Sequence, residues 1–407
     1  MNRLLVEGRL VDGLEGVRTG QVLMESGIIQ RVGDRLGRPD LRFDDAHLVF
    51  PGFGDIHVHL REGQEHKEDF TTGSRAALHG GVTFMLDMPN NPEPPVDAPS
   101  LERKAGRVGD PPAAIRLYAA MGPGTRPFGH SHYKAFMAHS IGPLYFESLA
   151  QVEEAVGRYR GCRITFHCED PEMLERAAGA ARHEDRRPPE AEIAAIEAAV
   201  AMAARHELRA NIAHLSTAGG LEVIRRARAQ GLEITCEVTP HHLYFDRENR
   251  AGAERADFLK MNPPLRSPSD REALLEAVLA GEIDFLATDH APHTVEEKAS
   301  ENPSGVPHLD TYGGFVAWLL HRGWTPEAAA RHASLRPGQF FGERVGRLAP
   351  GYRGDLAVLR LDREWTVRAE DLQTRCGWSP FEGERLPGRV AVAVARGRVF
   401  RGGEEVT

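Results

Sequence analysis

The sequence has few cysteines, few aromatic residues and no long hydrophobic run. Its 407 residues include four cysteines, at positions 162, 168, 236 and 376, and no CxxC pair. They are therefore expected to be reduced, mostly buried thiols rather than a disulfide framework. No stretch approaches the roughly 18 apolar residues of a membrane span. The first residues, MNRLLVEGRLVDG, lack the apolar core and cleavage site of a secretory signal. We therefore expect a cytoplasmic protein without a membrane partner.

Positive charge is also in deficit. The 50 lysines and arginines face 59 aspartates and glutamates, which gives a formal charge of −9. This balance disfavours a nucleic-acid-binding protein. Hydrophobic residues make up 41% and charged residues 27% of the chain, which is ordinary globular usage and excludes wholesale disorder. Histidine is the informative residue, because several of its 19 copies stand in short apolar segments.

The two ends of the chain have one sequence texture and the middle has another. Residues 1–50 and 347–407 contain short β-like runs broken by glycine and aspartate. These ends are predicted to pair into one small composite β-sandwich domain. In residues 51–346, short apolar runs alternate with stretches of helical period that are rich in alanine, glutamate and arginine. This alternation is typical of βα units and a parallel sheet.

The middle region contains eight candidate strands, and eight is the number that closes a (β/α)₈ TIM barrel. We therefore predict an α/β fold with strands at 53–60, 82–87, 114–120, 133–138, 162–167, 210–214, 232–237 and 283–288. Helices are expected over 68–79, 148–160, 171–182, 189–207, 218–230, 269–280 and 312–321. No helix is expected between the third and fourth strands. The Pro-rich stretch 92–99 and the segment 291–311 are expected to be loops.

Polar residues gather where these strands end, and the C-terminal strand ends form the mouth of such a barrel. His57 and His59 stand two apart on the first strand, so they share one face. An HxH pair alone is more often two ordinary histidines. Here His167, His214 and Asp289 follow other strands and bring five potential ligands to one ring. Imidazole nitrogens and carboxylate oxygens bind Zn²⁺, so this ring predicts a catalytic metal site.

The loops after the strands carry candidates for substrate binding. Arg61 directly follows HVHL, where its guanidinium suits an anionic substrate beside the metal, although pairing with a neighbouring acid is an equal alternative. On the residues alone, Asn90 favours an Asx turn over a substrate contact. Asn262 lies in an equally ambiguous loop. The segment TDHAPH carries three titratable groups in residues 289–293, which is dense for a routine loop.

Together these segments resemble the dihydroorotases of the amidohydrolase superfamily, in particular the class I bacterial type. The matching segments are PGFGDIHVHLRE at 51–62, KEDFTTGSRAALHGGVT at 67–83, MPN at 88–90, FHCED at 166–170, AHLSTAGG at 213–220, CEVTPHHLYF at 236–245, KMNPPLRS at 260–267 and ATDHAPHT at 287–294. They run in family order. The segment GYRGDLAVLRLD at 351–362 is similar to the returning strand of cyclic amidohydrolases.

The resemblance implies a site with two zinc ions. His57 and His59, with Asp289, match the ligands of one zinc, and His167 and His214 match those of the other. Lys134 is similar to the lysine that some members carboxylate to bridge the metals. Many class I bacterial members have an aspartate near this place, so a lysine with a buried stem and an exposed head is the alternative.

The resemblance also implies a substrate and its contacts. Arg61, Asn90 and His293 match residues that hold the substrate carboxylate, and Asn262 matches a residue that contacts the ring. Three further residues are left as supporting groups behind the ligands: Glu237, His241 and His242.

The implied reaction is the reversible cyclisation of N-carbamoyl-L-aspartate to L-dihydroorotate in pyrimidine synthesis, with Asp289 as the proton carrier. One alternative is a hydantoinase or allantoinase, against which Arg61 and His293 argue, since a neutral hydantoin offers them no carboxylate. Another is a non-catalytic dihydroorotase-like subunit that serves as a scaffold for aspartate transcarbamoylase, although such subunits typically lose metal ligands. The family implies a homodimer, and association with aspartate transcarbamoylase is a further option.

Overall fold

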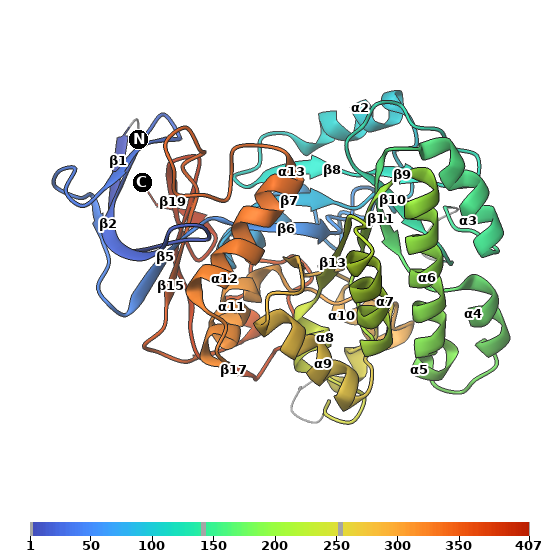
Figure 1. The fold of residues 1–407 in the computed structure, drawn as a ribbon. Helices are drawn as coiled ribbons and strands as arrows, with labels where there is room; N and C mark the ends of the chain where they lie inside the picture. Colours follow the sequence, from blue (N-terminus) through green and yellow to red (C-terminus); the bar gives the residue numbers. More distant parts are fainter. Residues whose placement is uncertain (1–2, 140–143, 251–254, 407) are drawn as a thin grey trace.

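The computed structural model describes residues 3–139, 144–250 and 255–406. It consists of a barrel of β/α units beside a β-sheet that both ends of the chain build (Figure 1). None of the helices in these ranges is long and apolar enough to cross a membrane. We propose that residues 51–346 form the barrel domain, and that 1–50 with 347–407 form the β-domain.

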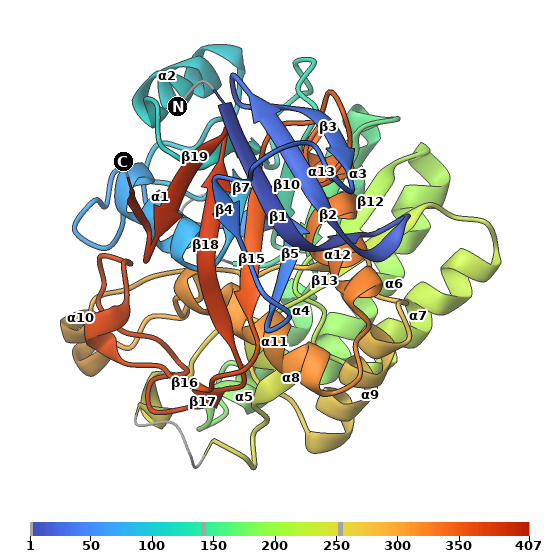
Figure 2. The ribbon, with the colours of Figure 1, turned by 90° about the vertical axis from the view of Figure 1, so that its left-hand side faces the viewer.

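Strands from both chain ends pair in one nine-stranded sheet, as the sequence predicted (Figure 2). The order is β20-β19-β18-β15-β5-β1-β2-β3, with β4 beside β1. The strands are β1 (Arg3–Asp12), β2 (Gly16–Glu25), β3 (Ile28–Gly33), β4 (Leu41–Arg42), β5 (His47–Pro51), β15 (Leu356–Arg360), β18 (Arg389–Ala395), β19 (Arg398–Arg401) and β20 (Glu404–Glu405). Strand β5 joins the two ends, because it pairs in parallel with β1 and antiparallel with β15. Alternating aliphatic residues such as Val49, Val358 and Val392 form the core of this domain.

The eight predicted barrel strands are present, with the third divided in two. They are β6 (Phe53–Val58), β7 (Val82–Asp87), β8 (Ala114–Leu117) with β9 (Ala119–Met121), β10 (Tyr133–Phe136), β11 (Arg163–His167), β12 (Arg209–Ile212), β13 (Ile234–Val238) and β14 (Phe285–Leu286). Parallel pairing connects consecutive strands in two series, from β6 through β7 to β8 and from β9 through to β14. A parallel bridge between Val58 and His290 links the first strand to the residues that follow the last one. The division falls at Tyr118, whose buried hydroxyl donates to the Ile56 carbonyl.

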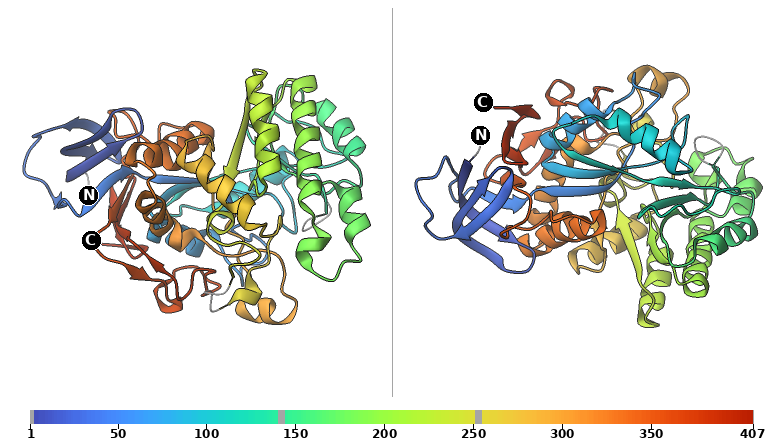
Figure 3. Two further views of the ribbon diagram at one scale, coloured as in Figure 1. Left: turned by 60° about the horizontal axis from the view of Figure 1, so that its bottom comes forward. Right: turned by 90° about the horizontal axis from the view of Figure 1, so that it is seen from above.

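Helices cover the outside of the barrel (Figure 3). The longer ones are α1 (Phe70–His79), α2 (Ala98–Val108), α3 (Leu149–Val156), α6 (Pro189–His206), α7 (Ala218–Ala229), α9 (Pro268–Leu279) and α11 (Tyr312–His321). The short ones are α4 (Pro171–Ala177), α5 (His183–Arg186), α8 (Pro240–Tyr244), α10 (Val295–Ser300), α12 (Pro326–Ala330) and α13 (Arg336–Phe341). A π-helical turn (Arg331–Leu335) joins the last two. After β15, the short strands β16 (Trp365–Thr366) and β17 (Arg385–Leu386) pair antiparallel. Side-chain caps such as Asp69 and Ser267 begin several helices by accepting N–H groups of the first turn.

Two loop predictions were wrong in part. Helix α2 begins inside the stretch 92–99, because Asp97 caps it and Pro99 stands in its first turn. The segment 291–311 contains α10 and a 3₁₀ turn at Leu309–Thr311. The predicted absence of a helix between the third and fourth strands is confirmed for residues 122–132.

Candidate active site at the barrel mouth

A cavity of about 240 Å³ opens at the C-terminal ends of the barrel strands. Eight of the predicted site residues line it: His57, His59, Arg61, Asn90, His167, His214, Asn262 and Asp289. The cavity wall also includes Arg187 and residues 303–305. Lys134 is buried on β10 and His293 lies directly beside Arg61. The structure therefore brings all ten predicted residues to one end of the barrel.

Three of these residues have strained backbones. Arg61, His214 and Asp289 have φ values of 59°, 34° and 49°, in the left-handed region that side chains rarely adopt. Each such residue costs about 1–3 kcal/mol, and this kind of strain concentrates at functional sites. The strain falls where the chain leaves the barrel strands and turns these side chains into the mouth.

His57, His59 and Asp289 form one half of the predicted ring of metal ligands. His57 donates its Nδ1–H to Glu237 Oε2 at 2.9 Å, and His59 donates its own to Asn90 Oδ1 at 2.7 Å. The Nε2 atom of each ring is then unprotonated and carries a lone pair. The two Nε2 atoms, of His57 and His59, lie 3.2 and 3.0 Å from Asp289 Oδ1. Lone pairs facing a carboxylate at this distance repel one another unless a cation lies between them.

His167, His214 and Lys134 form the other half. His167 donates its Nε2–H to the buried carboxylate of Glu169 at 2.7 Å, so its Nδ1 is unprotonated and carries a lone pair. That Nδ1 lies 3.0 Å from His214 Nε2. Among the described residues, neither Lys134 Nζ nor His214 Nδ1 has a hydrogen-bond partner, although both are buried. One atom each from His57, His214 and Asp289 lies within 4.8 Å of the others.

Burial sets the charges in this ring. It holds the pKa of His57 and of His214 well below the ordinary 6.5, with a further contribution from Lys134, so both imidazoles are neutral. Burial also lowers the pKa of Lys134 to about 8. Asp289 is buried directly beside His57 and His59. Neutral imidazoles and an ionised carboxylate are the forms that bind metals.

A second group of residues forms a cationic corner beside the ring, which we define as Arg61, Lys67 and His293. Arg61 donates Nε–H to the Pro292 carbonyl at 3.0 Å, and its Nη2 lies 3.1 Å from His293 Nε2. Lys67 Nζ lies 3.3 Å from His293 Nδ1. Burial and the charges of Arg61 and Lys67 lower the pKa of His293 to about 2. Two buried cations therefore flank a neutral imidazole, which suits a carboxylate.

The remaining predicted residues lie around the cavity. Asn262 turns toward it, and its Oδ1 has no partner within the described ranges. Glu237 orients His57 from behind. His242 donates to the Pro263 carbonyl at 3.1 Å, while His241 Nδ1 contacts His308 at 2.7 Å. Asp87 lies outside the cavity and pairs with the buried Lys104 at 2.6 Å.

Sequence reasoning missed Lys67, Glu169 and Arg187. Glu169 stands two residues after His167, just past the end of β11, and that spacing was a usable signal for a partner of His167. Lys67 lies in the matched segment KEDF but contacts a histidine 226 positions away. Arg187 binds Glu169 through two nitrogens from the link before α6, where the sequence has no distinctive pattern.

Comparison with known proteins agrees with this geometry. The model of the amidohydrolase family matches residues 48–399. Dihydroorotases of Pyrococcus furiosus and Thermococcus kodakarensis are 32% and 34% identical, over 99% and 100% of this chain and 92% and 96% of their own. The dihydroorotase of Anaeromyxobacter dehalogenans is 34% identical over 97% of each chain. Among solved structures, the L-hydantoinase of Arthrobacter aurescens superposes with a TM-score of 0.90 over 100% of this chain and 98% of its own. At 24% identity, that likeness concerns the fold alone.

Proposed function

The chain belongs to the amidohydrolase family and, within it, to the dihydroorotases, hydrolases that act on cyclic amides, and we propose that it interconverts N-carbamoyl-L-aspartate and L-dihydroorotate in pyrimidine biosynthesis. The observation that carries this choice of substrate is the cationic corner beside the ring of metal ligands. A cyclic amide substrate that carries a carboxylate could place its amide beside the metal ligands and its carboxylate in the cationic corner.

The amidohydrolase family is typically metal-dependent, and the donor set of this chain fits divalent cations. The fit rests on the lone pairs of His57 and His59 that face Asp289, and on the unpartnered buried atoms of His214 and Lys134. We propose that two Zn²⁺ ions bind here, one at His57, His59 and Asp289 and the other at His167 and His214. Bound there, they would lower the pKa of a water molecule and polarise the carbonyl of the ring.

Lys134 is proposed to bridge the two metals as an N6-carboxylated lysine. The neutral amine adds to carbon dioxide and releases one proton, and a pKa of about 8 leaves part of this amine neutral at physiological pH. Lys134→Met in protein purified with zinc and bicarbonate is expected to reduce the metal content from about two ions per chain to one. An unchanged content would contradict the bridge and leave the function intact.

Asp289 carries the proton in the proposed mechanism. In ring opening, its carboxylate takes the proton of the attacking water and returns it to the leaving ring nitrogen. The ionised carboxylate is the form that accepts a proton, and Asp289 lines the cavity in which the substrate would bind. In the biosynthetic direction, the same proton passes back from the attacking amide nitrogen to the departing water.

The cationic corner holds the substrate carboxylate in this proposal. Arg61 and His293 each offer N–H groups there, Asn90 lines the same cavity, and Asn262 reaches the ring. A hydantoin or allantoin carries no carboxylate for this corner. The test is a panel of the three rings with zinc-loaded enzyme, in which we expect dihydroorotate to be opened with by far the highest kcat/KM. Preference for hydantoin would refute the assignment, and absence of both metal and turnover would favour the scaffold.

Assembly and location are proposed from the family likeness. A homodimer is expected, which light scattering of the purified protein checks, and association with aspartate transcarbamoylase would be visible as co-elution of the two proteins. The cytoplasm is the proposed location, where the four free cysteines would stay reduced.

A further inference from the structure

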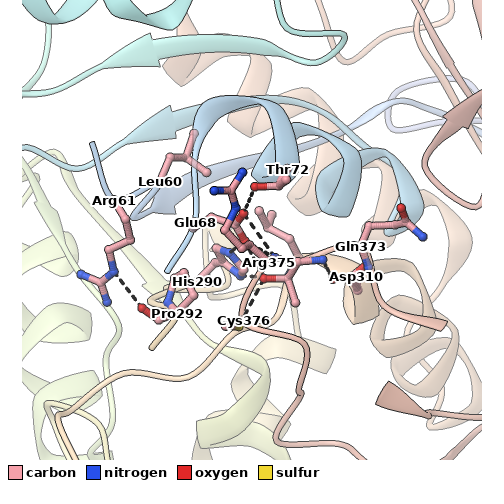
Figure 4. Close-up of polar contacts among 12 residues, drawn as sticks. Leu60, Arg61, Glu68, Thr72, His290, Pro292, Asp310, Gln373, Arg375 and Cys376 are labelled. Atoms are coloured by element: carbon pink, nitrogen blue, oxygen red, sulfur yellow. Dashed lines mark hydrogen bonds and ion pairs between the residues drawn. The ribbon is translucent and has the colours of Figure 1, made fainter. Parts of the chain in front are cut away.

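A segment from the C-terminal part of the chain, residues 373–378, lies against the loops of the barrel mouth (Figure 4). Its backbone N–H groups are held by two barrel carboxylates. Those of Gln373 and Thr374 donate to Asp310 at 2.7 and 3.1 Å, and that of Arg375 donates to Glu68 at 3.3 Å. Three successive N–H groups are therefore committed to fixed positions on the barrel.

Glu68 connects this segment to the loop that follows β14. It is fully buried, and its Oε2 accepts the Thr374 hydroxyl at 2.5 Å. His290 Nδ1 accepts the backbone N–H of His308, so its Nε2 carries the proton and donates to Glu68 at 3.4 Å. The carbonyl of His290 in turn accepts the N–H of His59. Thr374 is thus two hydrogen bonds away from the residue that adjoins Asp289.

Trp378 makes a second connection to the same loop. Its indole is fully buried, and Nε1–H donates to the His293 carbonyl at 2.8 Å. The preceding carbonyl, of Pro292, accepts Nε–H of Arg61. Two successive carbonyls of one loop therefore accept hydrogen bonds from different residues: that of Pro292 from Arg61 and that of His293 from Trp378.

We propose that Trp378 and Thr374 are positioning residues that set the preference of this site for a ring bearing a carboxylate. This inference rests on the proposed function and names the residues that position its carboxylate-binding corner. The segment 373–378 fixes loop 290–293, and that loop sets where the N–H groups of Arg61 and His293 converge. A ring without a carboxylate does not use this corner, so its binding is insensitive to the segment.

The experiment measures kcat/KM for L-dihydroorotate and for 5,6-dihydrouracil, the same ring without the carboxylate, on zinc-loaded full-length enzyme. Where dihydrouracil is not turned over, its inhibition constant replaces kcat/KM. Trp378→Phe keeps the aromatic packing and removes the N–H, and Thr374→Val removes the hydroxyl. Each is expected to raise KM for dihydroorotate about three- to tenfold, the weight of one hydrogen bond, and to leave dihydrouracil and metal content unchanged. Gln373→Ala is the matched control, because Gln373 joins Asp310 through its backbone.

A double variant separates positioning from general stability. In an Arg61→Gln background the grip on the carboxylate is already lost, so adding Trp378→Phe is expected to cost nothing further. Equal losses for both rings, a full additional loss in the double variant, or no loss in either single variant would overturn the inference. If Trp378→Phe fails to fold, Thr374→Val still decides it. A wild-type enzyme that does not open dihydroorotate would refute the proposed function and this inference together, whereas normal turnover with an unmoved preference refutes the inference alone.

Discussion

Replacing Lys67 by methionine tests how the cationic corner works. An ammonium group only donates hydrogen bonds, so His293 Nδ1, 3.3 Å from Lys67 Nζ, must accept. The proton of the neutral ring then lies on Nε2, which donates to the Ser304 carbonyl at 3.2 Å. Arg61 Nη2, 3.1 Å from this Nε2, cannot donate to a protonated nitrogen. Arg61 Nη2 therefore keeps its N–H groups for a carboxylate, and the Nε2–H of His293 would be shared between that carboxylate and the Ser304 carbonyl.

Without Lys67, the His293 ring is free to carry its proton on Nδ1. Its Nε2 would then accept from Arg61, and the substrate would lose one donor from the imidazole and compete for another. A hydrogen bond to a charged group is worth about 1.5–3 kcal/mol, which corresponds to roughly 10- to 150-fold in binding. We expect Lys67→Met to lower kcat/KM for dihydroorotate by about ten- to a hundredfold, mainly through KM, because the carboxylate does not react.

The assay is steady-state ring opening of dihydroorotate across a range of concentrations, with metal content measured on the same samples. Glu297→Gln is the control, since Glu297 contacts Lys67 at 3.3 Å but leaves the ammonium in place. We expect its KM to stay within about twofold of wild type. An unchanged KM in Lys67→Met, or an equal loss in Glu297→Gln, would refute the tautomer argument.

Three further predictions concern chemistry and stability. Asp289→Asn is expected to lower kcat by about 10²–10⁴ and retain metal, and turnover within a factor of about ten of wild type would contradict its role as proton carrier. Lys104→Met leaves the buried carboxylate of Asp87 unpaired and should destabilise the fold by about 3–5 kcal/mol in urea unfolding, with partial recovery in the double variant with Asp87→Asn. Burial lowers the pKa of His132 to about 3. Because the unfolded chain takes up this proton near pH 6.5, the contribution of His132 to stability is constant above that pH and falls by about 1.4 kcal/mol per pH unit from there down to about pH 3. The fall in melting temperature on acidification should be smaller in His132→Gln.

The barrel could be predicted because its strands alternate with helices in a regular pattern. Strand ends locate the mouth, so His57, His59, His167 and His214 could be assigned to one ring before any coordinates were considered. The same logic failed for α2. Its sequence, APSLERKAGRV, has Leu101, Ala105 and Val108 at helical spacing, and Leu101 and Val108 pack against the core. Only Lys104 is fully buried, however, and the Pro-rich stretch in which the helix begins indicates a loop.

The contacts that orient the site could be predicted less well than its ligands. A ligand stands at a strand end, and that position is local information. Lys67 acts on a side chain 226 positions away, and Glu68 accepts a hydroxyl 306 positions away. Such pairs depend on how loops fold over the mouth and on the return of the C-terminal segment, neither of which has a periodic signal in the sequence.

Under the proposed function, the residues that carry out the reaction are separate from the residues that select the substrate. The proposed metal ligands stand at or directly after the ends of barrel strands, and His57 and His167 are oriented by buried partners, so their positions follow from the fold that this chain shares with a hydantoinase at a TM-score of 0.90. The cationic corner is built from two loops outside the strands, the loop after β6 and the loop after β14, and residues 373–378 contact the second of these loops. Substitutions in these segments can alter the carboxylate grip without moving a ligand. A preference for one cyclic amide over another can therefore change while the reacting centre stays the same, which is why the distinction between a dihydroorotase and a hydantoinase has to be sought in Arg61, Lys67 and Trp378 rather than in the histidines.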